Sequence, residues 1–301
     1  MSSVNVAGTS SLEWVKTRVK AYMELIKFRL SALVTFSAVF GFILGDSSVT
    51  FSWPNFVGLA LGGFLITGAS GAANEIMERD LDKLMKRTEN RPLPLNIISL
   101  SEAYLFTTLL AFLGIGFLWI FTNPLTTFLG VLSMALYVFA YTPLKRVGPI
   151  AVFVGAIPGA MPPLLGWTAA TGAITYEALI IFGIQFIWQF PHFWAIAWVS
   201  DEDYKRAGFK LLPSGGGKDL NTAFQIMIYT LFLLPLGLLP TYFGLTGLNS
   251  GIIATICGVL FLAQTFSLMR DGSRKSALKI MFGSFLYLPI VQISYLLDKM
   301  P

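Results

Sequence analysis

Three polar side chains recur at four-residue intervals where an apolar segment gives way to a charged stretch, between residues 74 and 94. They are Asn74, Glu78 and Asp82. On an α-helix of 3.6 residues per turn, eight positions rotate the face by only about 80°, so all three can point the same way. Asp80 falls between them, on roughly the opposite side. The spacing therefore predicts a helix that presents one amide and two carboxylates on a common face.

Basic side chains follow this acidic face as the segment leaves the apolar region. They are Lys83, Lys86, Arg87 and Arg91. Mg²⁺ in proteins typically binds one or two carboxylates and completes its shell with water and phosphate oxygens, so this combination suits a metal ion bound to a phosphate-bearing substrate. The alternative is a polar helix end stabilised by i,i+4 salt bridges. Ionisable groups near lipid are costly and tend to be functional, which favours the metal site.

The composition predicts a polytopic membrane protein. Of 301 residues, 55% are hydrophobic and only 12% are charged, and the mean hydropathy is +0.70. We expect an all-α bundle of nine transmembrane helices that forms one domain, residues 26–301, after an N-terminal tail, residues 1–25. Nine apolar segments have the length of membrane helices: 28–45, 54–78, 100–121, 124–141, 148–168, 177–199, 223–243, 249–269 and 277–297.

Lysine and arginine are confined to alternate connections. They occur before the first span and after the second, fourth, sixth and eighth spans, whereas the other connections carry none and only Lys299 lies at the opposite end. The positive-inside rule then places the N-terminus and the charged loops in the cytoplasm and the C-terminus outside. The same distribution explains the net charge of +5 without nucleic acid, since no basic stripe with interleaved aromatic residues is present.

Two more charged loops share the membrane face of the Asn74 helix, because they also follow even-numbered spans. Tyr141 and Lys145 lie four residues apart in YTPLKR, and the Lys145 side chain could reach a phosphate or simply anchor the helix end at the interface. Asp203 and Arg206 follow the sixth span. Two acidic clusters on one face would allow a two-metal clamp on a diphosphate.

His192 is the only histidine and lies inside the sixth apolar segment. Its membrane position favours a functional role, and a neutral imidazole is a natural axial ligand for haem iron. A hydrogen-bonded helix-packing residue is the alternative. Its aromatic neighbours in the sequence are Trp188, Phe190, Phe193 and Trp194.

These motifs resemble those of the UbiA-type membrane prenyltransferases, and within them the haem O synthases. Asn74, Glu78 and Asp82 are similar to the family motif NxxxDxxxD, with glutamate in place of the first aspartate, and YTPLKR also matches the wider family. Three runs resemble the haem O synthases: RTENRPL (87–93), PHFWAIA (191–197) and DYKRAGFKLLP (203–213). The resemblance covers about residues 25–297. It departs at Ala207, where the family usually has a second aspartate four residues after Asp203.

The resemblance implies transfer of a farnesyl group from farnesyl diphosphate to a vinyl group of haem B, with Mg²⁺ as cofactor and water as the source of the new hydroxyl. It implies catalysis and metal binding by Asn74, Glu78, Asp82 and Asp203, with the three carboxylates as metal ligands, and diphosphate binding by Arg87, Arg91, Tyr141, Lys145 and Arg206. Haem binding by His192 is expected from its position inside the sixth apolar segment. Membrane lipid and haem A synthase or cytochrome oxidase assembly factors are the further expected partners, in the cell inner membrane. An aromatic or quinone-precursor acceptor remains open, as does a small-molecule transporter.

Overall fold

The computed structural model describes residues 11–47, 50–215 and 217–300, and nine helical stretches within them are long and apolar enough to cross a membrane. The prediction of an all-α protein with nine spans is confirmed, and most span ends differ from the predicted ones by a few residues. The spans are α2 (Phe28–Gly45), α3 (Trp53–Asp82), α4 (Leu100–Phe121), the composite of α5 (Pro124–Ala135), η1 (Leu136–Tyr141) and α6 (Thr142–Leu144), α7 (Ile150–Thr171), α8 (Tyr176–Val199), α10 (Leu220–Tyr242), α11 (Leu248–Asp271) and α12 (Arg274–Leu297).

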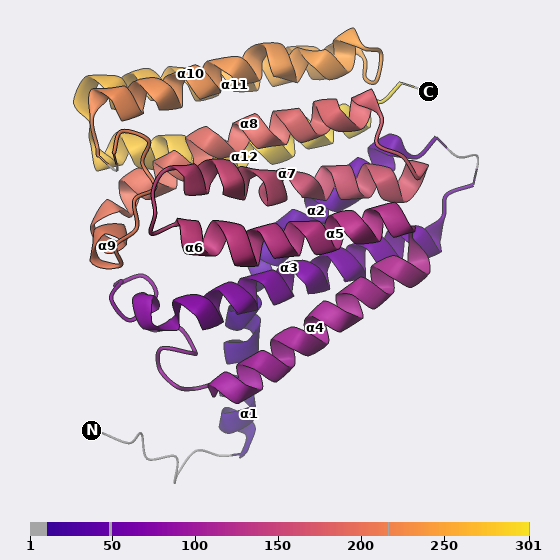
Figure 1. Cartoon of the computed structure of the whole chain (residues 1–301). Helices are drawn as coiled ribbons and strands as arrows, with labels where there is room; N and C mark the ends of the chain where they lie inside the picture. Colours follow the sequence, from indigo (N-terminus) through magenta and orange to yellow (C-terminus); the bar gives the residue numbers. More distant parts are fainter. Residues whose placement is uncertain (1–10, 48–49, 216, 301) are drawn as a thin grey trace.

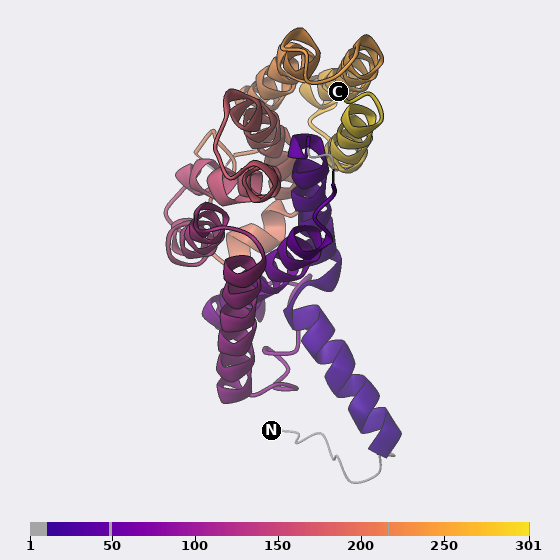
Figure 2. The same ribbon diagram turned by 90° about the vertical axis from the view of Figure 1, so that its right-hand side faces the viewer.

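The spans run side by side, and α10 and α11 form an outer hairpin on one flank of the bundle (Figures 1 and 2). α2 packs against α3 and α7, and α8 packs against α7, α10 and α12. α7 is the most enclosed span, with 72% of its apolar window buried, whereas α4 has only 11% buried. α7 is therefore central and α4 lies at the periphery.

α3 approaches its neighbour α4 closely through glycines. A Cβ atom at Gly62 would lie 2.8 Å from the Leu118 side chain and 3.0 Å from the Gly114 carbonyl oxygen, and one at Gly114 would lie 2.9 Å from the Ile66 nitrogen. Small residues at such positions let membrane helices pack backbone to backbone. Gly62 of α3 and Gly114 of α4 thus let α4 pack closely against α3, the long helix whose other end carries the acidic face.

The fourth span changes its helical register before it reaches the charged end. The N–H of Thr142 donates to the carbonyl of Tyr137, five residues back, within the π-helix η1. Pro143 has no N–H and its ring would collide with the carbonyl four residues earlier, and a π-turn relieves both conflicts. Tyr141 and Lys145, which flank this turn, are both buried.

The segment expected as a tail contains a helix, α1 (Ser11–Leu25), and residues 1–10 lie outside the described residues. α1 runs across the direction of the spans and projects from the bundle (Figure 2). Arg18 attaches it to the beginning of α4 by donating to the Ile97 carbonyl and to the Glu102 carboxylate. Leu25 at the end of α1 is fully buried. The division into a tail and one membrane domain stays a prediction.

Candidate active site

α3 ends in three buried carboxylates on one face: Glu75, Glu78 and Asp82, which are 1%, 5% and 0% exposed. Steps of three and four residues place them on successive turns, and the seven-residue interval from Glu75 to Asp82 brings these two almost into register. Asp80 is exposed on the other side, as its spacing predicts. Glu75 was not predicted as a site residue, because the four-residue spacing starts at Asn74. The seven-residue interval between Glu75 and Asp82 could have revealed it.

Lys145 neutralises Glu78. Its Nζ atom lies 2.9 Å from Glu78 Oε1 and donates a hydrogen bond of 3.1 Å to Oε2. The ammonium also lies 4.8 Å from the centroid of the Tyr141 ring and 5.7 Å from that of Phe209. Burial alone would lower the pKa of Lys145, but the Glu78 carboxylate outweighs it and raises that pKa. Lys145 is therefore a buried cation rather than an interfacial anchor.

Arg91 bridges the other two carboxylates. Its Nη1 donates to Asp82 Oδ2 at 2.8 Å, and its Nε lies 3.5 Å from Glu75 Oε1. Lys27 approaches the same Glu75 oxygen at 3.9 Å. Three carboxylates thus face three cations in a region largely withdrawn from solvent, as expected where an unpaired charge would be strongly destabilising.

Lys27 joins this group from the turn between α1 and α2. In the sequence it is one of the basic residues before the first span, which indicated only the orientation of the chain in the membrane. Its backbone is left-handed, with φ 49° and ψ 52°, a conformation that disfavours non-glycine residues by about 1–2 kcal/mol and that often marks functional sites. Its Nζ donates to Asn74 Oδ1 at 2.9 Å, and the Asn74 amide donates to Thr142 Oγ1 at 3.2 Å. Burial lowers the pKa of Lys27 to about 8, against an ordinary 10.5.

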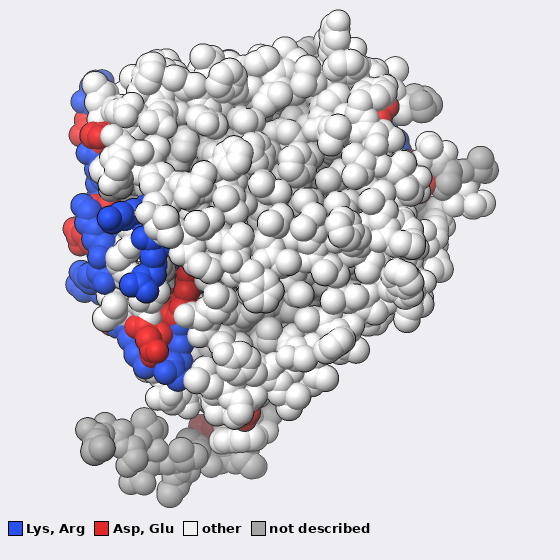
Figure 3. Space-filling view, in the orientation of Figure 1, with Lys and Arg blue, Asp and Glu red and all other residues white. Residues whose placement is uncertain are grey.

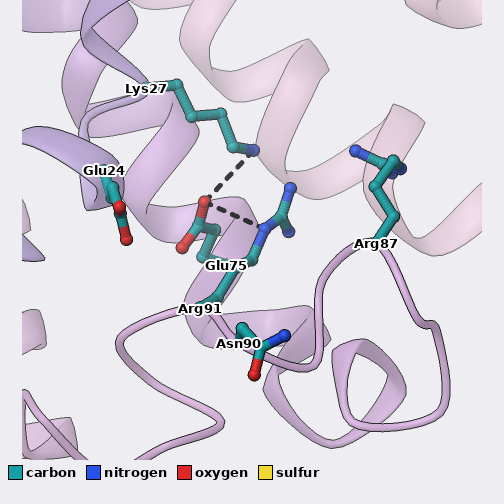
Figure 4. A pocket seen from close by; sticks show the side chains of 6 residues that line it. All are labelled: Glu24, Lys27, Glu75, Arg87, Asn90 and Arg91. Carbon is teal, nitrogen blue, oxygen red and sulfur yellow. Dashed lines mark ion pairs between the residues drawn. The ribbon is translucent and has the colours of Figure 1, made fainter.

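A pocket of about 340 Å³ opens beside these residues. Figure 4 shows Lys27 and Arg91 converging on Glu75, with Arg87 across the opening. Glu24 and Asn90 complete the lining. Three cationic side chains around one opening suit an anionic ligand with several acceptor oxygens, such as a diphosphate.

Asp203 connects two of the charged loops. It lies in α9 (Asp201–Arg206), and its carboxylate accepts hydrogen bonds from the backbone N–H groups of Lys86 at 3.2 Å and Arg87 at 3.3 Å. Arg206 Nη1 donates to the same carboxylate at 3.1 Å. The N–H of Lys210 then donates to the Lys145 carbonyl at 3.1 Å, which joins the third loop. The three loops, which were predicted to share one membrane face, therefore contact one another, and the charges gather at one end of the molecule (Figure 3).

The predicted metal ligands do not form a preformed cluster. Within the described residues, no three His, Cys, Asp or Glu side chains come together in a way that could hold a metal ion. Asp203 is engaged by backbone amides and by Arg206, so its metal role stays a prediction. Glu78 and Asp82 suit Mg²⁺ better, because Asp82 Oδ1 is a buried oxygen that accepts no hydrogen bond from described residues and Glu78 Oε1 contacts only the Lys145 ammonium, at 2.9 Å. Two such carboxylates match the usual protein share of a Mg²⁺ shell.

His192 lies apart from the carboxylate face, seven residues before the end of α8, or about 10 Å of helix rise. Its side chain is 8% exposed, and its Nδ1 is 2.7 Å from Ser284 Oγ of α12. Its ring stacks on Trp188 with centroids 4.5 Å apart and meets Phe193 and Phe285 edge to face. The structure thus contains two distinct polar regions, one charged and one aromatic.

Comparison with known proteins assigns the chain to a family. Residues 34–288 match the UbiA prenyltransferase family. A protoheme IX farnesyltransferase of Cytophaga hutchinsonii is 51% identical over 94% of this chain and 99% of its own length, and that of Christiangramia forsetii is 44% identical over 92% and 93%. Among solved structures, a digeranylgeranylglyceryl phosphate synthase superposes with a TM-score of 0.77 at 20% identity, covering 93% of this chain and 98% of its own.

A UbiA homologue from Archaeoglobus fulgidus, solved with GPP and Mg²⁺, superposes with a TM-score of 0.62 at 16% identity, over 91% of this chain and 99% of its own. At such identities these two structures establish the fold alone. The sequence matches establish the family as well as the fold, because they have high identity and cover nearly the whole of this chain and of each relative. The protein is a membrane-embedded member of the UbiA prenyltransferase family, in the group whose members are named protoheme IX farnesyltransferase.

Proposed function

We propose that this protein transfers a farnesyl group from farnesyl diphosphate to a vinyl group of protohaem IX (haem B), releasing diphosphate and giving haem O. The observation that carries the proposal is the buried face of Glu75, Glu78 and Asp82 with its matching cations, of which Glu75, Lys27 and Arg91 also line a 340 Å³ pocket. The names of the similar full-length relatives supply the prenyl donor and the acceptor.

Charge balance explains why the donor site needs a divalent cation. Lys27, Arg91 and Lys145 are already matched by the three carboxylates, so a diphosphate entering this region brings uncompensated negative charge. Mg²⁺ held by Glu78 and Asp82 supplies the compensating charge when it is bound. Solved UbiA homologues with bound GPP or DMAPP and Mg²⁺ support this assignment.

The chain's own residues then stabilise the departing diphosphate. Arg87 and Arg91 border the pocket and present N–H groups in the planar arrangement that recognises phosphate. Lys27 and Lys145 place compact positive charges at the same end, where a low local dielectric strengthens their attraction for the negative charge that develops as the allylic C–O bond breaks. Asn74 positions Lys27 through their 2.9 Å hydrogen bond.

The allylic cation left behind must meet the acceptor before it meets water. The segments around the charged end supply aromatic faces for it: Tyr137 and Tyr141 lie with ring centroids 5.2 Å apart, and Tyr141 already contacts the Lys145 cation. The electron-rich vinyl group of haem B then attacks the cation, and water adds to the resulting carbocation and gives up one proton to the released diphosphate or to solvent, which leaves the hydroxyl group of haem O.

The charged end faces the cytoplasm in this proposal. The reason is the confinement of Lys and Arg to the connections at this end. Reporter fusions should place residues 85, 145, 210 and 273 inside and residues 49, 172 and 247 outside; residue 49 lies outside the described residues. A cytoplasmic signal at residue 172 would contradict the orientation.

The activity is tested with purified protein, Mg²⁺, radiolabelled farnesyl diphosphate and either haem B or a quinone precursor. We expect label in haem only, in a Mg²⁺-dependent reaction, and no product with Glu78→Gln. Label in the quinone precursor would show that this compound, and not haem B, is the acceptor. Movement of unchanged label across a vesicle, without a new compound, would indicate a transporter instead.

A further inference from the structure

The hydrogen bonds around His192 fix its tautomer. Ser284 Oγ lies 2.6 Å from the Met281 carbonyl oxygen, and a hydroxyl has one proton to donate. Because that proton goes to the carbonyl, the 2.7 Å contact between Ser284 Oγ and His192 Nδ1 is one in which Nδ1–H donates and the hydroxyl oxygen accepts. A neutral imidazole protonated on Nδ1 carries its free lone pair on Nε2.

The orientation of the imidazole is fixed as firmly as its tautomer. Trp188 stacks on one face with an interplanar angle of 18°, and the same indole N–H donates to the Ser284 carbonyl at 3.0 Å. Phe193 and Phe285 meet the ring edge to face at 5.3 and 5.0 Å. Ser284 thus holds both the histidine and the ring that stacks on it.

The free nitrogen is the part of this histidine that packing does not explain. A histidine that serves only to join helices would use Nδ1 as seen here and would usually satisfy Nε2 as well, since buried polar atoms are normally hydrogen-bonded. No described residue makes a hydrogen bond to His192 Nε2, and this nitrogen is not among the fully buried atoms that lack a partner, so it is accessible from outside the seam. Phe285 is 43% exposed, so the imidazole lies one side chain beneath the apolar outer surface, within reach of a lipid-dissolved ligand.

We propose that His192 Nε2 binds the iron of haem B and that Ser284 is the positioning residue that prepares the imidazole for it. This inference rests on the proposed function and adds how the acceptor is held. A metal-binding histidine generally donates its other ring N–H to an oxygen, which fixes the ring and makes the ligating nitrogen more basic. The Ser284 hydroxyl supplies that oxygen, and the surrounding rings supply apolar contacts for the porphyrin.

The test compares haem B with metal-free protoporphyrin IX on the purified full-length protein. Iron ligation predicts that the wild type binds haem B at least about tenfold more tightly than protoporphyrin IX, with the absorption and resonance Raman signature of a histidine ligand. His192→Gln should bind the two porphyrins equally and lose the signature. Because protoporphyrin IX has the same shape, its unchanged affinity shows that the variant remains folded.

Ser284 is tested by a conservative pair of variants. Ser284→Ala should keep the histidine signature and weaken haem B binding about tenfold, in line with the effect of removing the outer hydrogen bond of a metal ligand. Ser284→Thr, which keeps a hydroxyl, should restore most of the affinity, and protoporphyrin IX should bind all variants alike. Added imidazole should restore the ligand signature to His192→Ala.

Equal affinity of the wild type for the two porphyrins, or a histidine signature that persists in His192→Gln, would overturn the inference. Farnesylation of haem B by such a protein would leave the proposed function intact. A wild type that binds haem B through His192 but never farnesylates it would instead overturn the proposed function and leave this inference standing.

Discussion

The charged end of α3 and the seam between α8 and α12 are two polar regions built in opposite ways. At the charged end, three buried carboxylates of one helix meet Lys27, Arg91 and Lys145, which come from three different connections. At the seam, one neutral imidazole is held by a hydroxyl and three rings that belong to the two helices themselves. The first region is assembled by loops, and the second by helix packing.

The difference matches the two substrates. A diphosphate is recognised by charge, and loops can rearrange their cations around it when it binds. A porphyrin is a rigid apolar plate whose iron needs one nitrogen at a fixed place, which a helix–helix contact can provide. Substitutions at the charged end should therefore affect the prenyl donor and leave haem binding unchanged.

The largest effect is expected from Glu78→Gln and Asp82→Asn. Each removes a carboxylate charge and keeps the size of the side chain, and loss of charge stabilisation in such a site lowers the rate by about 10²-fold or more. Transfer of radiolabelled farnesyl to haem B measures this, and the haem absorption spectrum should not change. Asp80→Asn is the matched control, because Asp80 is on the same helix but exposed. Near-normal turnover by either variant, with unchanged Mg²⁺ dependence, would show that the donor site does not lie on this face of α3.

The ion pair of Glu78 also predicts a stability effect that can be separated from catalysis. Glu78→Gln leaves the buried Lys145 ammonium without its carboxylate, a change that typically destabilises a protein by about 3–5 kcal/mol. The double variant Glu78→Gln/Lys145→Met removes both charges and should recover most of the thermal stability. Its activity should remain lost, and recovery of both together would mean that the pair acts only through folding.

A smaller, pH-dependent effect is expected from Lys27→Met. Burial lowers the pKa of Lys27 to about 8, so the wild-type side chain is charged at pH 7 and mostly neutral at pH 9. Its affinity for a diphosphate such as inorganic pyrophosphate with Mg²⁺ should fall several-fold between these values. Lys27→Met should bind about tenfold more weakly at pH 7 and show little change with pH. A fall of equal size in the variant would assign the titration to another group.

The same residue makes a prediction for folding, with the opposite sign. Between about pH 8 and the ordinary pKa of 10.5, the unfolded chain binds more protons at Lys27 than the folded one does. The free energy of unfolding should therefore contain a contribution from Lys27 that rises with pH across this window. Unfolding of detergent-solubilised wild type and Lys27→Met, compared at pH 7.5 and 9.5, isolates that contribution.

Sequence patterns predicted the parts of this molecule that depend on local periodicity. The nine spans, the acidic face of α3 and the common end of the charged loops follow from hydrophobic length, helical spacing and the distribution of Lys and Arg. Lys27 and Ser284 could not be found this way. The role of Lys27 depends on a left-handed turn and that of Ser284 on the packing of α12 against α8, and neither leaves a signal in spacing.

Asp203 is the residue for which the family's sequence pattern and the structure differ most. Its substitution should have the smallest effect on farnesyl transfer. The family pattern implies a metal ligand, whereas the structure shows a carboxylate that accepts the N–H groups of Lys86 and Arg87. If it serves to hold the loop that carries Arg87 and Arg91, Asp203→Asn should raise the KM for farnesyl diphosphate several-fold with little change in kcat, since the amide oxygen still accepts one of the two hydrogen bonds.

The metal dependence of that variant decides between the two roles. A positioning residue leaves the Mg²⁺ concentration for half-maximal activity unchanged, whereas a lost metal ligand raises it and lowers kcat as strongly as Asp82→Asn does. Glu202→Gln is the matched control, because Glu202 neighbours Asp203 in α9 and is exposed. An Asp203→Asn variant that behaves like Asp82→Asn would extend the metal site from α3 to α9, and the charged end would then act through two acidic segments rather than one.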